Sequence, residues 1–149
     1  TTELFLRGPN YIEIWVSIGI NVRAGFSIAQ IREAVKQELL DFLSPLPKGA
    51  VNPTGWKLGK PVVDIELVAV ASRVQGVESV SGVKIALGKM AVQSQIPMTG
   101  LDLPLVAGIS VVMGDPLDID QVRGQMGAPS GDTGGKKKIV PVPVVPETC

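Results

Sequence analysis

The feature that most constrains the fold is a two-residue alternation near the N-terminus, in the segment YIEIWVSIGINV over residues 11–22. Isoleucine or valine occupies every even position, and the odd positions carry mainly polar or aromatic residues. Since successive side chains of a strand point to opposite faces, this period predicts one long strand with a single buried face. Tyr11 and Trp15 lie on the other face. We therefore expect helices to cover one side of the sheet and the other side to be open or available to a partner.

A change of period follows this strand. Ser27 is expected to cap a helix, with Gln30 completing a capping box and Phe26 packing on Ile31 as a hydrophobic staple. Apolar residues then recur at steps of three and four, which predicts an amphipathic helix ending at Ser44, because a proline follows. The expected inner face consists of Ile28, Ile31, Val35, Leu39 and Phe42.

The segments that follow complete a mixed pattern. Residues 62–74 fit either a strand or a helix capped by Asp64, with an inner face of Ile65, Val68, Ala69 and Ser72. Residues 80–87 and 107–113 alternate as strands do, whereas residues 88–104 are too irregular to assign. The order predicts an α/β (α+β) fold, a two-layer sandwich in which two helices cover one face of a small, mostly antiparallel sheet.

Length and composition indicate one hydrophobic core. The chain has 149 residues, is 45% hydrophobic and has a mean hydropathy of +0.31, so residues 1–113 are expected to form one domain. Residues 114–149 are rich in glycine and proline without helical period and predict an extended or disordered tail. Within it, the apolar stretch IVPVPVVP favours an extended or polyproline conformation suited to lying along a neighbouring chain.

Composition argues against several classes of function. The chain has no histidine, so it cannot build a Ser-His-Asp triad or a histidine metal site. Fourteen basic and fourteen acidic residues cancel, which provides no general field to attract nucleic acid. The single cysteine, Cys149, excludes an internal disulfide and a thiolate zinc cluster. No apolar run is long enough to predict insertion into a membrane.

Two segments resemble ligand-binding motifs without meeting their requirements. In SGDTGGKKK, Ser130 occupies the first glycine position of a phosphate loop, and Lys137 stands where serine or threonine is needed. The aspartates at 115, 118 and 120 lack the central glycine and distal glutamate of a calcium loop. We therefore expect no catalytic residues, no metal and no cofactor, and hence not an enzyme.

The segment SPLPKGAVNPTGWKLGKP, residues 44–61, is the most unusual connection in the chain. Its eighteen residues include four prolines, three glycines and Trp56, and it is much longer than a typical connection of about 4 to 6 residues. Trp56 is expected either to plug the edge of the core or to anchor a protein interface, where tryptophan and tyrosine are enriched. The candidate interface residues are Tyr11, Trp15, Pro45, Leu46, Trp56, Leu58 and Lys60.

Residues 8–113 resemble the C-terminal domain of the baseplate J-like proteins, the wedge proteins of contractile phage tails and related contractile injection systems. The resemblance lies in a P-x-Y that opens the long strand, a helix ending in F-L-x-P-L, a G-W-x-x-G-x-P run and a V-x-G-V-x-x-V turn. Leu58 and Lys60 depart from it, since the family often has an aromatic and an arginine there. The matching residues are Pro9, Tyr11, Phe42, Leu43, Pro45, Leu46, Gly55, Trp56, Gly59, Pro61, Val74, Gly76, Val77 and Val80.

The resemblance implies structural work in the baseplate of a phage tail or injection particle assembled in the bacterial cytoplasm. The implied partners are other wedge subunits, with self or paralogue contacts in a sixfold assembly. It also favours a helix over residues 62–74. A regulatory domain that binds a small molecule is the alternative, because such sandwiches often bind ligands at sheet edges.

Overall fold

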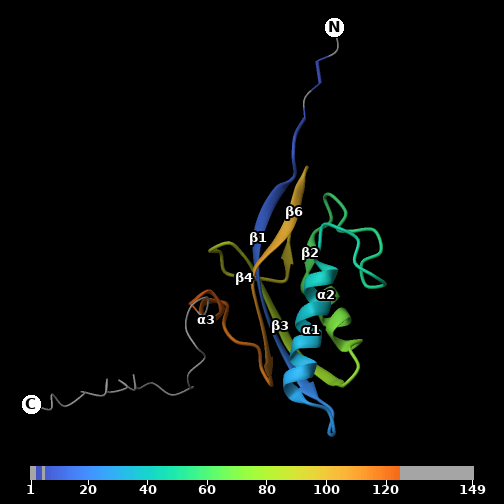
Figure 1. Ribbon diagram of the computed structural model, residues 1–149. Coiled ribbons are helices and arrows are strands. Elements are labelled where there is room, and N and C mark those ends of the chain that lie inside the picture. Colours follow the sequence, from blue (N-terminus) through green and yellow to red (C-terminus); the bar gives the residue numbers. More distant parts are fainter. Residues whose placement is uncertain (1–2, 5, 125–149) are drawn as a thin grey trace, which may run out of the picture.

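The computed structural model of the protein describes residues 3–4 and 6–124 (Figure 1). A four-stranded sheet of order β4-β3-β1-β6 forms one layer, and a separate two-stranded sheet pairs β2 with β5. This arrangement confirms the α/β sandwich predicted from the sequence. The elements, in chain order, are β1 (Asn10–Val22), α1 (Ile28–Phe42), β2 (Val62–Val63), α2 (Asp64–Ser72), β3 (Val77–Leu87), β4 (Val92–Gln93), β5 (Gln95–Ile96), β6 (Asp102–Met113) and α3 (Ile119–Gly124).

Strand β1 is the centre of the large sheet. It pairs antiparallel with β3 and parallel with β6, while β4 pairs antiparallel with β3. At the start of the parallel pair, the Asn10 side chain donates to an Asp102 carboxylate oxygen at 2.9 Å, and the Thr99 backbone N–H donates to the other oxygen at 3.1 Å. These hydrogen bonds, the Asn10 bond most of all, lower the pKa of Asp102 below its ordinary value. The parallel pair is therefore fixed at its first residues.

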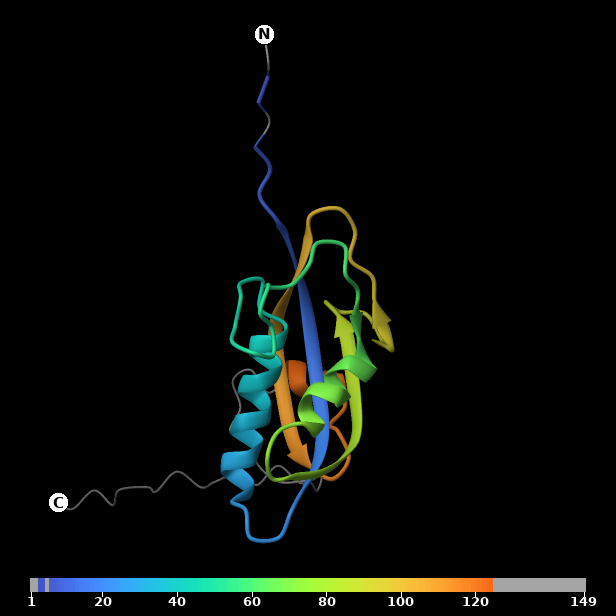
Figure 2. The same cartoon turned by 90° about the vertical axis from the view of Figure 1, so that its right-hand side faces the viewer.

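The predicted isoleucine ridge of β1 lies at the centre of the core. Helices α1 and α2 cover this face of the sheet (Figure 2). Each fully buried aliphatic side chain contributes about 1.5–3 kcal/mol relative to its exposed state, so this layer is the main source of stability. The buried residues are Ile14, Val16, Ile18 and Ile20 from β1, Ile31, Val35 and Leu39 from α1, and Leu67, Val70 and Ala71 from α2.

The beginning of α1 agrees with the sequence prediction in place but not in detail. Ser27 is the N-cap residue, with extended backbone angles, but its side chain makes no capping hydrogen bond, so the predicted capping box is wrong. Phe26 and Ile31 both lie against Gly76, where an added Cβ would be 2.9 Å and 2.5 Å from them. Ile28, predicted to face inward, is half exposed.

Helix α2 confirms the helical alternative for residues 62–74, but its predicted inner face is wrong. Leu67, Val70 and Ala71 are buried, whereas Ile65 is 69% exposed. The strand just before the helix explains which side of α2 faces the core. Val62 pairs with Ile96 in the small sheet, both fully buried, and this pairing sets the rotation at which α2 begins. The N-cap is Val63 rather than Asp64.

The second face of the large sheet is partly covered. The expectation of an extended conformation from residue 114 onward is wrong for residues 119–124, which form α3 on the side opposite α1 and α2 (Figure 1). Ile119 and Val122 are buried, and so is Ser17 beneath this face. Arg123 donates to the carbonyls of Gly88 and Met90, each at 2.7 Å, which holds α3 in place. The predictions for the IVPVPVVP stretch, the SGDTGGKKK segment and Cys149 lie outside the described residues.

Candidate protein-docking loop

The long loop of residues 44–61 is folded back onto the C-terminal end of α1 (Figure 1). Asn52 is the anchor. Its buried side-chain amide donates to the backbone carbonyls of Asp41 at 3.1 Å, Phe42 at 3.2 Å and Ser44 at 2.8 Å. The last carbonyls of a helix have no intrahelical partner, so this one side chain caps α1 from within the loop.

Backbone hydrogen bonds fix the two limbs of the loop. The Lys48 N–H donates to the Asn52 carbonyl at 2.7 Å, and the Trp56 N–H donates to the Ser44 carbonyl at 3.0 Å. Gly55 makes this approach possible because its φ is +77° and an added Cβ would lie 2.3 Å from the Pro45 oxygen. Only glycine combines that backbone angle with that clearance.

Trp56 is packed inward, as in the plug alternative. It is 7% exposed, and its ring meets the Phe42 ring edge to face, with centroids 5.5 Å apart. Its indole N–H donates to the Lys60 carbonyl at 3.0 Å. The Lys60 ammonium lies 4.6 Å from the Trp56 centroid and 3.2 Å from a Glu66 carboxylate oxygen, which links the loop to α2. Little of the indole remains available to a partner.

The outer side of the same loop exposes apolar side chains. Leu46 is 67% exposed, Leu58 is 56% exposed, and Pro45 is also exposed. We call Pro45, Leu46 and Leu58 the loop surface. Its side chains reach solvent from a backbone that Asn52 and Trp56 hold in place, so they are available to a partner without first ordering the loop.

The remaining candidate residues belong to the second face of the sheet. Tyr11 is half exposed there. Trp15 is half buried because its ring covers Gly108 of β6, where an added Cβ would lie 2.4 Å from the indole. The seven candidates thus separate into a loop group, in which Trp56 and Lys60 support the exposed residues, and a sheet group in which Trp15 has a packing role.

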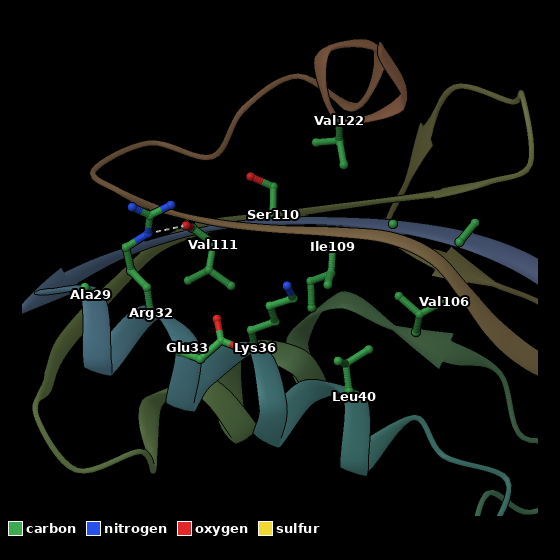
Figure 3. A pocket seen from close by; sticks show the side chains of 12 residues that line it. Ala29, Arg32, Glu33, Lys36, Leu40, Val106, Ile109, Ser110, Val111 and Val122 are labelled. Atoms are coloured by element: carbon green, nitrogen blue, oxygen red, sulfur yellow. Dashed lines mark hydrogen bonds between the residues drawn. The ribbon is translucent and has the colours of Figure 1, made fainter. Parts of the chain in front are cut away.

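Sequence reasoning missed two features. One is Asn52, whose type favours turns and caps but whose three distant partners no local pattern indicates. The other is a groove of about 610 Å³ between α1 and β6, in which Arg32 of α1 donates to the Val111 carbonyl at 2.7 Å (Figure 3). Pro104 was the available signal for an edge strand, because proline in a sheet is confined to edges, first residues and bulges.

Neither a cluster of metal-ligand side chains nor a membrane-spanning helix is found among the described residues. Within residues 3–4 and 6–124, no group of three or more acidic or cysteine side chains is placed to hold a metal ion. No helix in this part of the chain has the length and apolar character required to cross a membrane. Comparison with models of known protein families and with characterised proteins finds no match to the chain.

Proposed function

We propose that the chain is a structural, non-enzymatic component of the baseplate wedge of a contractile tail or injection system. The proposal rests mainly on the loop surface, which includes two exposed leucines. They lie on an eighteen-residue loop whose backbone is held by the Asn52 side chain and by backbone hydrogen bonds within the loop. The resemblance of residues 8–113 to baseplate J-like proteins supports this assignment, since several of its motif residues build that loop. The chain would act in the baseplate, within a particle assembled in the bacterial cytoplasm.

A prearranged loop suits assembly for a thermodynamic reason. Ordering a flexible loop on binding costs about 0.5–1.5 kcal/mol for each immobilised side chain, and this cost is reduced when the loop is already folded. The partner is a neighbouring wedge subunit or a second copy of the chain in a sixfold ring. Its contact surface would be apolar, to cover Leu46 and Leu58. Nucleic acid and membrane lipid are not expected partners, given the balanced charge.

The proposal is tested by placing charge on the loop surface. In the double variant Leu46→Asp/Leu58→Asp, both side chains are exposed, so the free energy of unfolding should change by no more than about 0.5 kcal/mol per site. Incorporation into particles should fall at least about tenfold, because carboxylates in an apolar interface lose their hydration without gaining a partner. Incorporation is measured by co-sedimentation of tagged chain with purified particles.

The matched control is Met90→Asp/Val92→Asp, which charges two apolar side chains of similar exposure, one just before β4 and one in β4. This control should assemble normally. Equal incorporation of the loop variant and the control, with both folded, would contradict the proposed docking surface.

A further inference from the structure

Strand β6 forms one edge of the large sheet, and the groove beside it follows six of its consecutive residues. Residues 106–111 of β6 form one wall, and the other wall comes from α1, with Arg32, Lys36 and Leu40 pointing toward the strand (Figure 3). Val122 of α3 lies at the opposite side of the strand. Because consecutive residues line it, the groove exposes backbone as well as side chains.

The hydrogen-bond pattern shows which backbone groups face the groove. The Leu101 carbonyl accepts from the Asn10 N–H of β1, and the Gly114 N–H donates to the Ile20 carbonyl of β1. The backbone groups of Leu101 and Gly114 therefore point inward, toward β1. The backbone groups of successive strand residues point to opposite sides, and the bulge opposite Ile14 and Trp15 shifts this alternation by one residue. The N–H and C=O groups of Val106, before the bulge, and of Ile109 and Val111, after it, therefore point outward, away from β1. Arg32 confirms this direction, because its guanidinium reaches the outward carbonyl of Val111.

The start of the same edge cannot accept a full strand. Pro104 occupies an outward position and has no N–H to donate. An added strand therefore has its free pairing sites at Val106 and Ile109, because the outward carbonyl of Val111 already accepts from Arg32. An edge with unpaired backbone groups invites association with an extended chain, and natural proteins usually cover it.

The chain itself contains a segment suited to that edge. In IVPVPVV, residues 139–145, prolines stand at 141 and 143, and valines stand at 140, 142 and 144. In an extended chain the backbone groups of alternate residues point to the same side. In that conformation the backbone N–H groups of all three valines can donate along one side. The other side lacks donors at both prolines, because proline has no backbone N–H. Such a strand can join a sheet edge and then end the sheet, because it cannot pair with a further strand.

The length of the chain outside the described residues permits this docking. Residues 125–138 separate Gly124 from Ile139, a tether that can span about 50 Å at roughly 3.3–3.6 Å per residue. The tether begins at residue 125, three residues after Val122, which lines the groove. A short flexible tether gives an effective concentration in the millimolar range, which favours the chain's own segment over that of another copy.

We infer that residues 139–145 add to the free edge of β6 in the same chain, as an antiparallel strand that places Val142 opposite Ile109. In an antiparallel pair, residues that exchange hydrogen bonds have their side chains on the same face. The valines then enter the groove with Ile109, whose side chain points toward α1 near Leu40 (Figure 3). This contact is independent of the proposed baseplate function.

Disulfide trapping in the full-length chain tests the contact. In a Cys149→Ser background, Ile109→Cys/Val142→Cys is compared with Met90→Cys/Val142→Cys, whose first site is exposed and outside the groove. The expected result is an intramolecular disulfide that forms at least about tenfold faster in the Ile109 variant, since docking raises the local thiol concentration. Rates are measured by non-reducing electrophoresis and mass spectrometry. Equal rates would overturn the inference, as would a disulfide found only between two chains.

A second readout avoids any change in the domain. Amide hydrogen exchange at Ile109, followed by NMR, should be slowed at least about tenfold in the wild-type chain relative to Val142→Pro, which removes the central donor of the segment. The free amide of Ile109 would then be protected by pairing with the segment. Equal exchange at Ile109 in the two chains would contradict the docking.

Discussion

Replacement of Gly19 with alanine is expected to displace residues 114–124 from the second face of the sheet. An added Cβ would lie 1.9 Å from the Gly114 oxygen and 2.7 Å from the Pro116 nitrogen, both backbone atoms that cannot rotate away. The buried side chains of Ile119 and Val122 would lose their contacts as the segment moves. At about 1.5–3 kcal/mol for each, the loss in the free energy of unfolding is roughly 3–6 kcal/mol, measured by urea denaturation.

Gly82→Ala provides the matched control for this prediction. Gly82 is opposite Gly19 in the β1–β3 register, but its added Cβ would meet only the Pro116 side chain, at 3.4 Å. Its free energy of unfolding should change by less than about 1 kcal/mol. Trypsin should also cleave after Arg123 faster in the Gly19 variant than in the control. Similar stability and similar cleavage of the two variants would contradict the close packing of this segment.

Trp56→Ala is expected to destabilise the domain by about 3–5 kcal/mol, the usual cost of removing a buried large aromatic side chain. The change removes the edge-to-face contact with Phe42 and the support beneath the Lys60 ammonium. For a domain of this size the melting temperature should fall by roughly 10–20 °C. Thermal unfolding is followed by far-UV circular dichroism, whose signal comes mainly from the backbone amides.

Leu58→Ala is the control from the same loop. Leu58 is exposed, so its truncation should change the free energy of unfolding by no more than about 0.5 kcal/mol. The contrast separates the two roles of the loop, since Trp56 stabilises the domain and Leu58 is available to a partner. Equal destabilisation by both substitutions would mean that the loop is not folded as described.

The elements with strong periodicity could be predicted from the sequence. The alternation over residues 11–22 indicated β1 and its buried face, and the spacing of Ile31, Val35 and Leu39 indicated α1. These patterns are local, because one face of each element is buried along its whole length. The inner face of α2 could not be predicted in this way, because its residues are apolar on nearly every side and its phase is set by the pairing of Val62 with Ile96.

The missed parts depend on contacts between distant residues. Helix α3 has only six residues and follows a turn-rich segment, so its sequence alone has little helical signal. Its position depends on the absence of a side chain at Gly19 and on carbonyls near residues 88–90 that Arg123 reaches. The loop was correctly singled out by its prolines, glycines and tryptophan. Its rigidity comes from Asn52, whose three carbonyl partners are eight to eleven residues away in the chain.

Hydrogen exchange of residues 44–61, measured by mass spectrometry on the isolated chain and on purified particles, tests the proposed role of this loop most directly. In the isolated chain, the amides of Asn52 and Trp56 should already be protected, because each donates a backbone hydrogen bond. In particles, peptides containing Leu46 and Leu58 should gain further protection, of at least about tenfold, as a partner covers the loop surface. Rapid exchange throughout the loop of the isolated chain, or identical exchange in the two samples, would contradict the account.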